Sequence, residues 1–399
     1  MRTLKSTLPE LNPPLRTLMG PGPSAIHPRV LEALAKPTVG HLDPSYLELM
    51  DRTQDLLRQL FRTDNAMTMA ISATGSAGME TCVVNLIEPG DPMVVCVNGV
   101  FGGRMADVAE RAGAEVTRIE KPWGEVFEPG DLESVLATAK PKVVGIVMAE
   151  TSTGAAQAIE PISQLVHDAG ALLVVDAVTS LGGMPVEVDA WNIDAIYSGT
   201  QKCLSCPPGL SPVSLSQRAM EVVLNRKTKV QSWYLDTTML ANYWGSDRVY
   251  HHTAPINMTY ALYESLRLIF EEGLESCFER HRLNHLALRD GLAAIGIEFA
   301  VREEAHRLPM LNAVKIPTGV EDAPLRRALL DRFGIEIGSG LGPFAGQVWR
   351  IGLMGHASRS SNVLLLLSAL EQLLIEAGLA IEAGSSVAAA NAVYVAHGK

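Results

Sequence analysis

A regular alternation of short apolar runs and amphipathic segments occupies residues 66–215 and constrains the fold more than any other feature. Runs typical of β-strands are Met67–Ser72, Pro92–Asn98, Glu115–Arg118, Val143–Ala149, Leu172–Asp176, Ala195–Ser198 and Ser211–Ser214. Segments with helical periodicity lie between most of them, at Gly75–Leu86, Gly103–Ala112, Asp131–Ala139 and Ile162–Ala169. Short turns join these elements, so the pattern predicts an α/β fold with a mostly parallel sheet covered on both faces.

The pattern changes on both sides of this region. The first residues contain several prolines and no periodicity, which indicates an extended arm. A long helical stretch without proline runs from Ile256 to about Leu292, and the tail 377–399 favours one more helix. Between them, strands are predicted at Phe299–Val301, Val314–Ile316, Ile335–Ile337 and Val348–Ile351, and helices at Leu325–Phe333 and Ser361–Glu376. We therefore predict an arm (1–19), a large domain (20–270) and a smaller C-terminal α+β domain (271–399).

Charge and cysteine usage narrow the class of protein. The net charge is −11 and no Lys/Arg-rich run occurs, which argues against nucleic acid or an anionic membrane as a partner. Neither a membrane-length apolar run nor a signal-like N-terminal segment is present. The five cysteines are an odd number, and Cys203 and Cys206 lack a second ligand pair, so no metal site is expected. These features predict a cytoplasmic enzyme.

A lysine and an acid in the second half of the alternation point to a chemistry. Asp176 ends the apolar run Leu172–Asp176, and Lys202 stands in a Ser/Gly/Thr turn about 25 residues later. A buried acid requires a cationic partner, and a lysine in such a turn can bind a carbonyl group covalently. Pyridoxal 5′-phosphate (PLP) needs both groups: a lysine binds its aldehyde, and an acid keeps its pyridine nitrogen protonated.

The turn at Thr74, Gly75 and Ser76 is a candidate phosphate site. It joins a predicted strand to a predicted helix, where small residues and free backbone N–H groups favour an anion. An ordinary structural Gly/Ser turn would have the same sequence pattern. The lysine and the acid further along the chain favour the interpretation as a phosphate-binding turn.

Two further residues fit the same site. Phe101 follows a predicted strand and could stack on a flat ring, although a lone aromatic is more often part of a core. Arg350 is a charge inside an apolar strand, where it could grip a substrate carboxylate or form a structural salt bridge.

Together these segments resemble the class V aminotransferases of fold type I, specifically the alanine–glyoxylate and serine–pyruvate group. The motifs that carry the resemblance are Gly20–Ser24, Glu150–Gly154, Ser198–Lys202, Tyr250–Thr253 and Arg350–Gly352. The resemblance implies a large domain with a mostly parallel seven-stranded sheet. It also implies PLP as cofactor, a ping-pong mechanism and a homodimer with shared active sites.

The resemblance assigns roles residue by residue. Lys202 and Asp176 are implied as catalytic, with Lys202 carrying the cofactor and moving a proton. Phe101 is implied to stack on the ring, and Thr151 to lie near its phenolic oxygen. Gly22 and His41 are implied to line the substrate site with Arg350. The residues implied to hold the phosphate are Thr74, Gly75, Ser76 and Gln201, with Tyr250 and Thr253 from the neighbouring subunit.

A subgroup that acts on ureidoglycine and glyoxylate is also similar. His41 stands where this subgroup is expected to have Gln, and Tyr250 where it is expected to have Asn. Both amides would recognise the ureido group, so their absence favours transfer from alanine or serine to glyoxylate or pyruvate. The ureidoglycine reaction remains the alternative.

Two other classes fit less well. A PLP-dependent sulfur-transfer lyase would need a cysteine on a flexible loop, and the loop Gly338–Phe344 has none. A nicotinamide-binding module would need G-x-G-x-x-G before a helix, and Pro343 interrupts that pattern.

Overall fold

A seven-stranded sheet forms the centre of the computed structural model, which describes residues 10–398. Its strand order is β2-β10-β9-β8-β5-β3-β4. The strands are β2 (Met67–Ile71), β3 (Pro92–Val97), β4 (Glu115–Glu120), β5 (Val143–Val147), β8 (Leu172–Asp176), β9 (Ala195–Tyr197) and β10 (Ser211–Leu215). Neighbouring strands are parallel except at β10, which is antiparallel to both β2 and β9. The predicted α/β fold with a mostly parallel sheet is confirmed.

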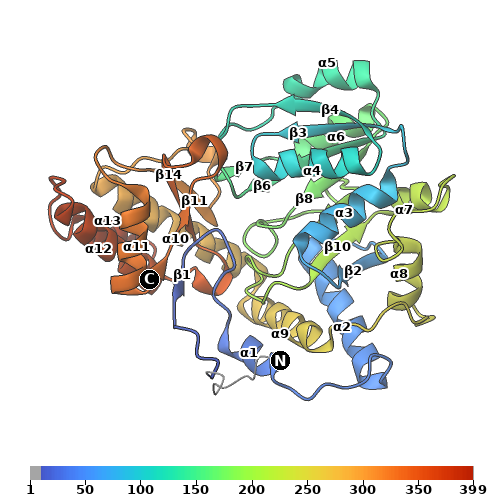
Figure 1. The fold of residues 1–399 in the computed structure, drawn as a ribbon, viewed down its shortest axis with the longest axis horizontal. Helices are drawn as coiled ribbons and strands as arrows, with labels where there is room; N and C mark the ends of the chain where they lie inside the picture. Colours follow the sequence, from blue (N-terminus) through green and yellow to red (C-terminus); the bar gives the residue numbers. More distant parts are fainter. Residues whose placement is uncertain (1–9, 399) are drawn as a thin grey trace, which may run out of the picture.

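Helices that alternate with the strands pack on this sheet (Figure 1). They are α3 (Gly75–Leu86), α4 (Val100–Arg111), α5 (Pro129–Ala139) and α6 (Glu160–Asp168). Two short helices that the periodicity did not predict follow β10, namely α7 (Gln217–Leu224) and α8 (Thr237–Trp244). Each begins at a capping side chain, because Ser216 accepts a hydrogen bond from Ala219 N and Asp236 accepts one from Thr238 N.

Helix α9 (Ile256–Glu272) packs against two helices that are distant from it in sequence, α1 (Pro28–Leu34) and α2 (Pro44–Phe61). The prediction of one continuous helix from Ile256 to Leu292 is wrong. Gly273 adopts φ +87° between α9 and α10 (Leu274–Ala294), and this backbone conformation cannot continue an α-helix.

The C-terminal part has its own sheet and core. Strands β11 (Leu311–Lys315), β14 (Val348–Gly352) and β13 (Gly338–Ser339) form an antiparallel sheet in that order. Helices α11 (Asp322–Phe333), α12 (Ser360–Glu376) and α13 (Ser385–Ala396) accompany it, in orange to red in Figure 1. A separate apolar cluster that includes Trp349, Leu367 and Tyr394 fills this part. The domain limits 1–19, 20–270 and 271–399 stay a prediction.

Several short elements differ from the predictions. Strand β1 (Thr17–Leu18), inside the predicted arm, pairs with β12 (Ile335–Glu336), so β12 does not join the three-stranded sheet. No strand forms at 299–301, where only an isolated bridge joins Phe299 to Val314. A small hairpin, β6 (Ala149–Glu150) and β7 (Ala155–Ala156), and three single-turn 3₁₀ helices (Glu304–His306, Gly342–Phe344 and Gly355–Ala357) complete the described elements. The predicted arm extends into residues 1–9 and the predicted tail helix to 399, which lie outside the described residues.

No helix between residues 10 and 398 combines the length and the apolar character that a membrane span requires.

Candidate active site

Lys202 lies buried in the loop that follows β9, with 8% of its surface exposed. Its Nζ donates a hydrogen bond to the Pro21 carbonyl oxygen. Burial, with the neighbouring Arg350 as a smaller cause, lowers the pKa of this amine to about 8. No ion pair joins it to a carboxylate within the described chain. A buried lysine with such a pKa can serve as a nucleophile near neutral pH.

A turn near the N-terminus fixes the lysine. Gly22 adopts φ +106°, which favours glycine, and a Cβ atom there would lie 2.8 Å from Lys202 Nζ and would displace the lysine side chain. Ser24 Oγ donates to the Lys202 carbonyl oxygen at 2.6 Å, and Ser24 N donates to the Gln201 carbonyl oxygen at 2.8 Å. The structure therefore brings the predicted residue Gly22 against the predicted lysine.

Asp176 ends β8 as a buried carboxylate with two neutral hydrogen-bond donors. Its Oδ1 accepts from Val178 N at 2.8 Å, and its Oδ2 accepts from the Tyr197 hydroxyl at 2.7 Å. Burial raises its pKa to about 6, although both hydrogen bonds act in the opposite direction. The parallel register places Tyr197 of β9 directly beside Asp176. Sequence reasoning missed Tyr197, because only the strand pairing reveals this neighbour.

The turn between β2 and α3 offers backbone donors at the same edge of the sheet. Thr74 precedes the first residue of α3, and its side chain makes no cap hydrogen bond. The N–H groups of Gly75 and Ser76 belong to the first helical turn, where no acceptor within the helix exists. Gln201 has a buried side-chain oxygen without a hydrogen-bond partner in the part of the chain that the structure describes. Such a buried polar atom requires a partner, and a ligand can supply one.

Arg350 reaches the site from β14 of the C-terminal sheet. Its Nε donates to the Ser339 carbonyl oxygen at 2.7 Å, and its Nη1 donates to the Thr151 carbonyl oxygen at 3.1 Å. Only 7% of Arg350 is exposed, and burial lowers the pKa of its guanidinium. The structure thus brings Thr151 and Arg350 together.

Phe101 is half-buried in the first turn of α4, and its backbone N–H donates to the Glu150 carboxylate at 3.0 Å. The guanidinium of Arg104 lies 4.9 Å from the centroid of the Phe101 ring. The sequence motif Glu150–Gly154 does not reveal that the Glu150 carboxylate is a buried hydrogen-bond acceptor.

His41 and the segment 250–253 lie close to one another and to the turn that leads into α3. The rings of His41 and Tyr250 are in contact, with centroids 5.1 Å apart, and Tyr250 is 56% exposed. His252 forms a hydrogen bond of 2.7 Å with Ser72 Oγ, so the segment 250–253 lies beside the turn that leads into α3. Among the described residues, no hydrogen bond or ion pair links His41, Tyr250 or Thr253 to Lys202, Asp176 or Arg350.

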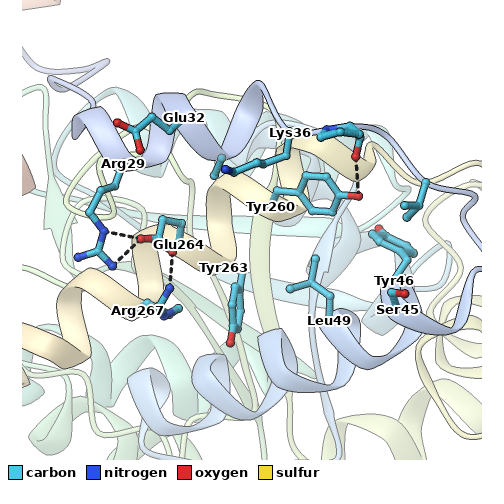
Figure 2. A pocket seen from close by; sticks show the side chains of 13 residues that line it. Arg29, Glu32, Lys36, Ser45, Tyr46, Leu49, Tyr260, Tyr263, Glu264 and Arg267 are labelled. Atoms are coloured by element: carbon cyan, nitrogen blue, oxygen red, sulfur yellow. Dashed lines mark hydrogen bonds and ion pairs between the residues drawn. The ribbon is translucent and has the colours of Figure 1, made fainter.

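A groove between α1, α2 and α9 lies elsewhere on the molecule (Figure 2). Arg29, Glu264 and Arg267 form an ion-pair network at one end, and the remainder is lined by tyrosines, apolar side chains, Glu32 and Lys36. None of the predicted site residues lines this groove.

Cys203 points away from the neighbouring lysine. Its Sγ donates to the Thr179 carbonyl oxygen at 3.2 Å, and burial raises the pKa of its thiol. A buried, protonated thiol is a poor nucleophile, so the arrangement gives no support to a sulfur-transfer lyase.

The arrangement agrees with comparisons to known proteins. The sequence profile of the family Aminotransferase class-V matches residues 19–359. This chain belongs to that family. Class V aminotransferases have fold type I and depend on PLP, and the seven-stranded sheet found here matches that fold.

Individual relatives cover almost the whole chain. Alanine–glyoxylate aminotransferase from Felis catus is 41% identical over 93% of this chain and 90% of the relative. The structure of alanine–glyoxylate aminotransferase from Nostoc sp. has a TM-score of 0.91 and 50% identity, covering 93% of this chain and 98% of that one. The structure of ureidoglycine–glyoxylate aminotransferase from Bacillus subtilis has a TM-score of 0.95 and 42% identity, covering 97% and 100%.

The residues present fit PLP. Lys202 supplies a buried amine with a lowered pKa, and Asp176 supplies a buried carboxylate without a cationic partner in the described chain. The first turn of α3 and the unpartnered Gln201 oxygen offer groups for a phosphate. A charged, phosphorylated pyridine aldehyde would satisfy all three.

Proposed function

We propose that this enzyme transfers the amino group of alanine or serine to glyoxylate or pyruvate by a ping-pong mechanism. The observation that carries this choice is the contact between His41 and Tyr250. The ureidoglycine subgroup is expected to have two carboxamides at these positions, and a carboxamide can pair with a ureido group through matched donors and acceptors. An imidazole and a phenol cannot make that pairing.

The ureidoglycine reaction is the second candidate. The Bacillus subtilis transaminase named for that reaction is 40% identical over 98% of this chain, so the similarity includes the C-terminal segment.

Bound PLP would supply the aldehyde that receives the amino group and a ring that accepts the electron pair released at the substrate Cα. Lys202 Nζ would hold the cofactor and then move the proton released at Cα, a role that its lowered pKa supports. Asp176 would face the ring nitrogen, and Tyr197 and Val178 N would keep its carboxylate oriented.

Other residues would hold the phosphate, the ring and the substrate. Gly75, Ser76 and Gln201, with Thr74, would hold the phosphate, and Phe101 would cover one face of the ring. Arg350 would bind the α-carboxylate, because a guanidinium held by two carbonyl oxygens presents its remaining N–H groups in a fixed direction. Thr151 would lie beside the ring, and Gly22 would leave room for the substrate next to Lys202.

We also propose a cytoplasmic homodimer in which Tyr250 and Thr253 complete the partner's phosphate site. Two observations support the dimer. Both residues are exposed, and large apolar side chains that include Trp233 and Val249 are exposed around them. The five cysteines are free and buried, which agrees with a reducing compartment.

Half-reactions separate the two candidate functions. Alanine and serine should each convert the bound cofactor to its amino form, and glyoxylate should restore the original visible spectrum. Ureidoglycine should react at least roughly tenfold more slowly, since the carboxamide pair is missing. A faster reaction with ureidoglycine than with alanine and serine would establish the second candidate instead.

A further inference from the structure

The side chain of Glu150 is a fully buried anion that the sequence-based site does not use. It is 0% exposed, and burial raises the pKa of its carboxyl. Its Oε1 accepts from Ser152 N at 3.0 Å and from Ser152 Oγ at 2.6 Å. Its Oε2 accepts from Phe101 N at 3.0 Å and from Gly102 N at 3.3 Å. A buried carboxylate persists only where donors replace water, and here two donors belong to the first turn of α4 and two belong to Ser152 in the turn after β6.

These hydrogen bonds hold the beginning of α4. The N–H groups of Phe101 and Gly102 have no acceptor within the helix, and Val100 N donates to Ser152 Oγ at 3.0 Å. A carboxylate at this end of a helix also interacts favourably with the helix dipole. The contact is close, because a Cβ at Gly99 would lie 2.4 Å from Glu150 Cδ. Phe101 is therefore fixed through its backbone.

The same turn also holds Arg350. The carbonyl oxygen of Thr151, the next residue, accepts from Arg350 Nη1 at 3.1 Å. The carbonyl oxygen of Glu150 accepts from Gly154 N at 2.8 Å and closes the turn. A shift of the Glu150 side chain would thus move both the Phe101 backbone and the acceptor of Arg350.

We propose that Glu150 is a positioning residue that couples the ring-stacking Phe101 to the carboxylate-binding Arg350. The inference rests on the function proposed above for these two residues. Glu150 does not touch the reacting atoms. Its carboxylate fixes the position of Phe101, which would cover the cofactor ring, relative to Arg350, which would bind the substrate carboxylate.

The chain contains a matched control at another helix. Glu371 is 6% exposed and accepts from Gly384 N, from Ser386 N at 2.9 Å and from Ser386 Oγ at 2.6 Å. These donors lie at the beginning of α13, and none of the proposed site residues is on this helix. Glu371 therefore accepts the same kinds of hydrogen bond, three compared with the four of Glu150, without a role in the site.

The experiment compares Glu150→Gln with Glu371→Gln in the purified full-length enzyme. In both variants the new amide keeps one acceptor oxygen, but its NH2 group faces a backbone N–H that then lacks an acceptor. Both variants should therefore lower the melting temperature by similar amounts. Only Glu150→Gln should weaken PLP binding about tenfold in a titration of cofactor-free protein, and reduce the visible circular dichroism of the bound cofactor. Its KM for alanine should rise about tenfold, whereas that of Glu371→Gln should stay within about twofold of wild type.

A second pair guards against a variant that does not fold. Ser152→Ala and Ser386→Ala each remove one donor to the respective glutamate, and only Ser152→Ala should weaken PLP binding, by about threefold. Wild-type PLP affinity and circular dichroism in Glu150→Gln or Ser152→Ala would overturn the inference. Equal losses in the Glu371 or Ser386 variants would also overturn it, because the effect would then be general destabilisation. Failure of the proposed function would appear instead in the wild-type half-reactions, while the PLP titration and dichroism require no substrate.

Discussion

The two sheets each bring one buried cation to the site, and these cations are held differently. Lys202, beyond the end of β9, is 8% exposed, and Arg350, within β14, is 7% exposed. Lys202 Nζ donates to one carbonyl oxygen, whereas Arg350 donates to two. Neither forms an ion pair with a carboxylate in the described chain.

Equal burial has different consequences for the two side chains. The pKa of Lys202 falls to about 8, so a substantial fraction of this amine is neutral near physiological pH. The guanidinium of Arg350 starts from a much higher pKa and stays charged although burial lowers it. Lys202 can therefore lose its charge, act as a nucleophile and carry a proton, whereas Arg350 remains a permanently charged guanidinium in a fixed orientation.

Lys202→Ala should give the largest effect, because it removes the group that holds the cofactor and moves the proton. Transamination should fall at least ~1000-fold, as expected when a nucleophile is lost. The visible absorbance of bound PLP should also change to that of the free aldehyde. Lys202→Arg is the control that keeps the charge without the nucleophile, and it should be equally inactive. Activity in either variant would remove Lys202 from its proposed role.

Arg350→Ala should affect substrate binding more than cofactor binding. Loss of a charged hydrogen-bond pair costs about 2–4 kcal/mol, which corresponds to a ~30- to ~900-fold increase in KM for alanine. Arg350→Lys keeps the charge and loses the fork, so it should recover only part of the difference. Steady-state kinetics at saturating PLP measure both. An unchanged KM in Arg350→Ala would place the α-carboxylate elsewhere.

The two cations are coupled, and pH reveals this coupling. Cofactor-free enzyme should take up PLP about tenfold faster for each pH unit up to about 8 and then level off, because the neutral amine attacks the aldehyde. Arg350 lowers the pKa of Lys202, so Arg350→Ala should move this plateau to higher pH. Stopped-flow absorbance between pH 6 and about 10 tests this. An identical profile in the two proteins would show that the cations do not interact.

Tyr197→Phe should give the smallest effect. It removes one of the two donors to Asp176, which costs about 1 kcal/mol and weakens PLP binding ~5-fold. The Tyr197 hydroxyl lowers the pKa of Asp176, so this pKa should rise in the variant. As the pH is lowered, Asp176 should then become protonated, and PLP affinity should begin to fall, at a higher pH than in wild type. PLP titrations from pH 5 to about 8 measure both effects. Wild-type affinity at every pH would show that the hydroxyl does not support Asp176.

Local patterns in the sequence predicted the large sheet and its end residues well. Each predicted strand of this sheet forms, and α3 has the predicted bounds Gly75–Leu86, because apolar periodicity and small turn residues act over short distances. Asp176 could be recognised because a charged residue at the end of an apolar run is unusual, and Lys202 because it is a lone lysine in a Ser/Gly/Thr turn about 25 residues later.

Long-range pairing could not be predicted in this way. Tyr197 lies beside Asp176 through the register of β8 and β9, and β12 pairs with β1 from the other end of the chain. The beginning of α4 at Val100, three residues earlier than predicted, depends on Glu150 and Ser152, about 50 residues away. Such contacts depend on the assembled fold, and no local periodicity encodes them.

The most direct test of the proposed chemistry is the position of the cofactor on the chain. Borohydride reduction of the purified enzyme followed by peptide mass analysis should place the phosphopyridoxyl mass on the peptide that contains Lys202. A modified peptide without Lys202, or no modified peptide from enzyme that is active with PLP, would contradict the role of this lysine.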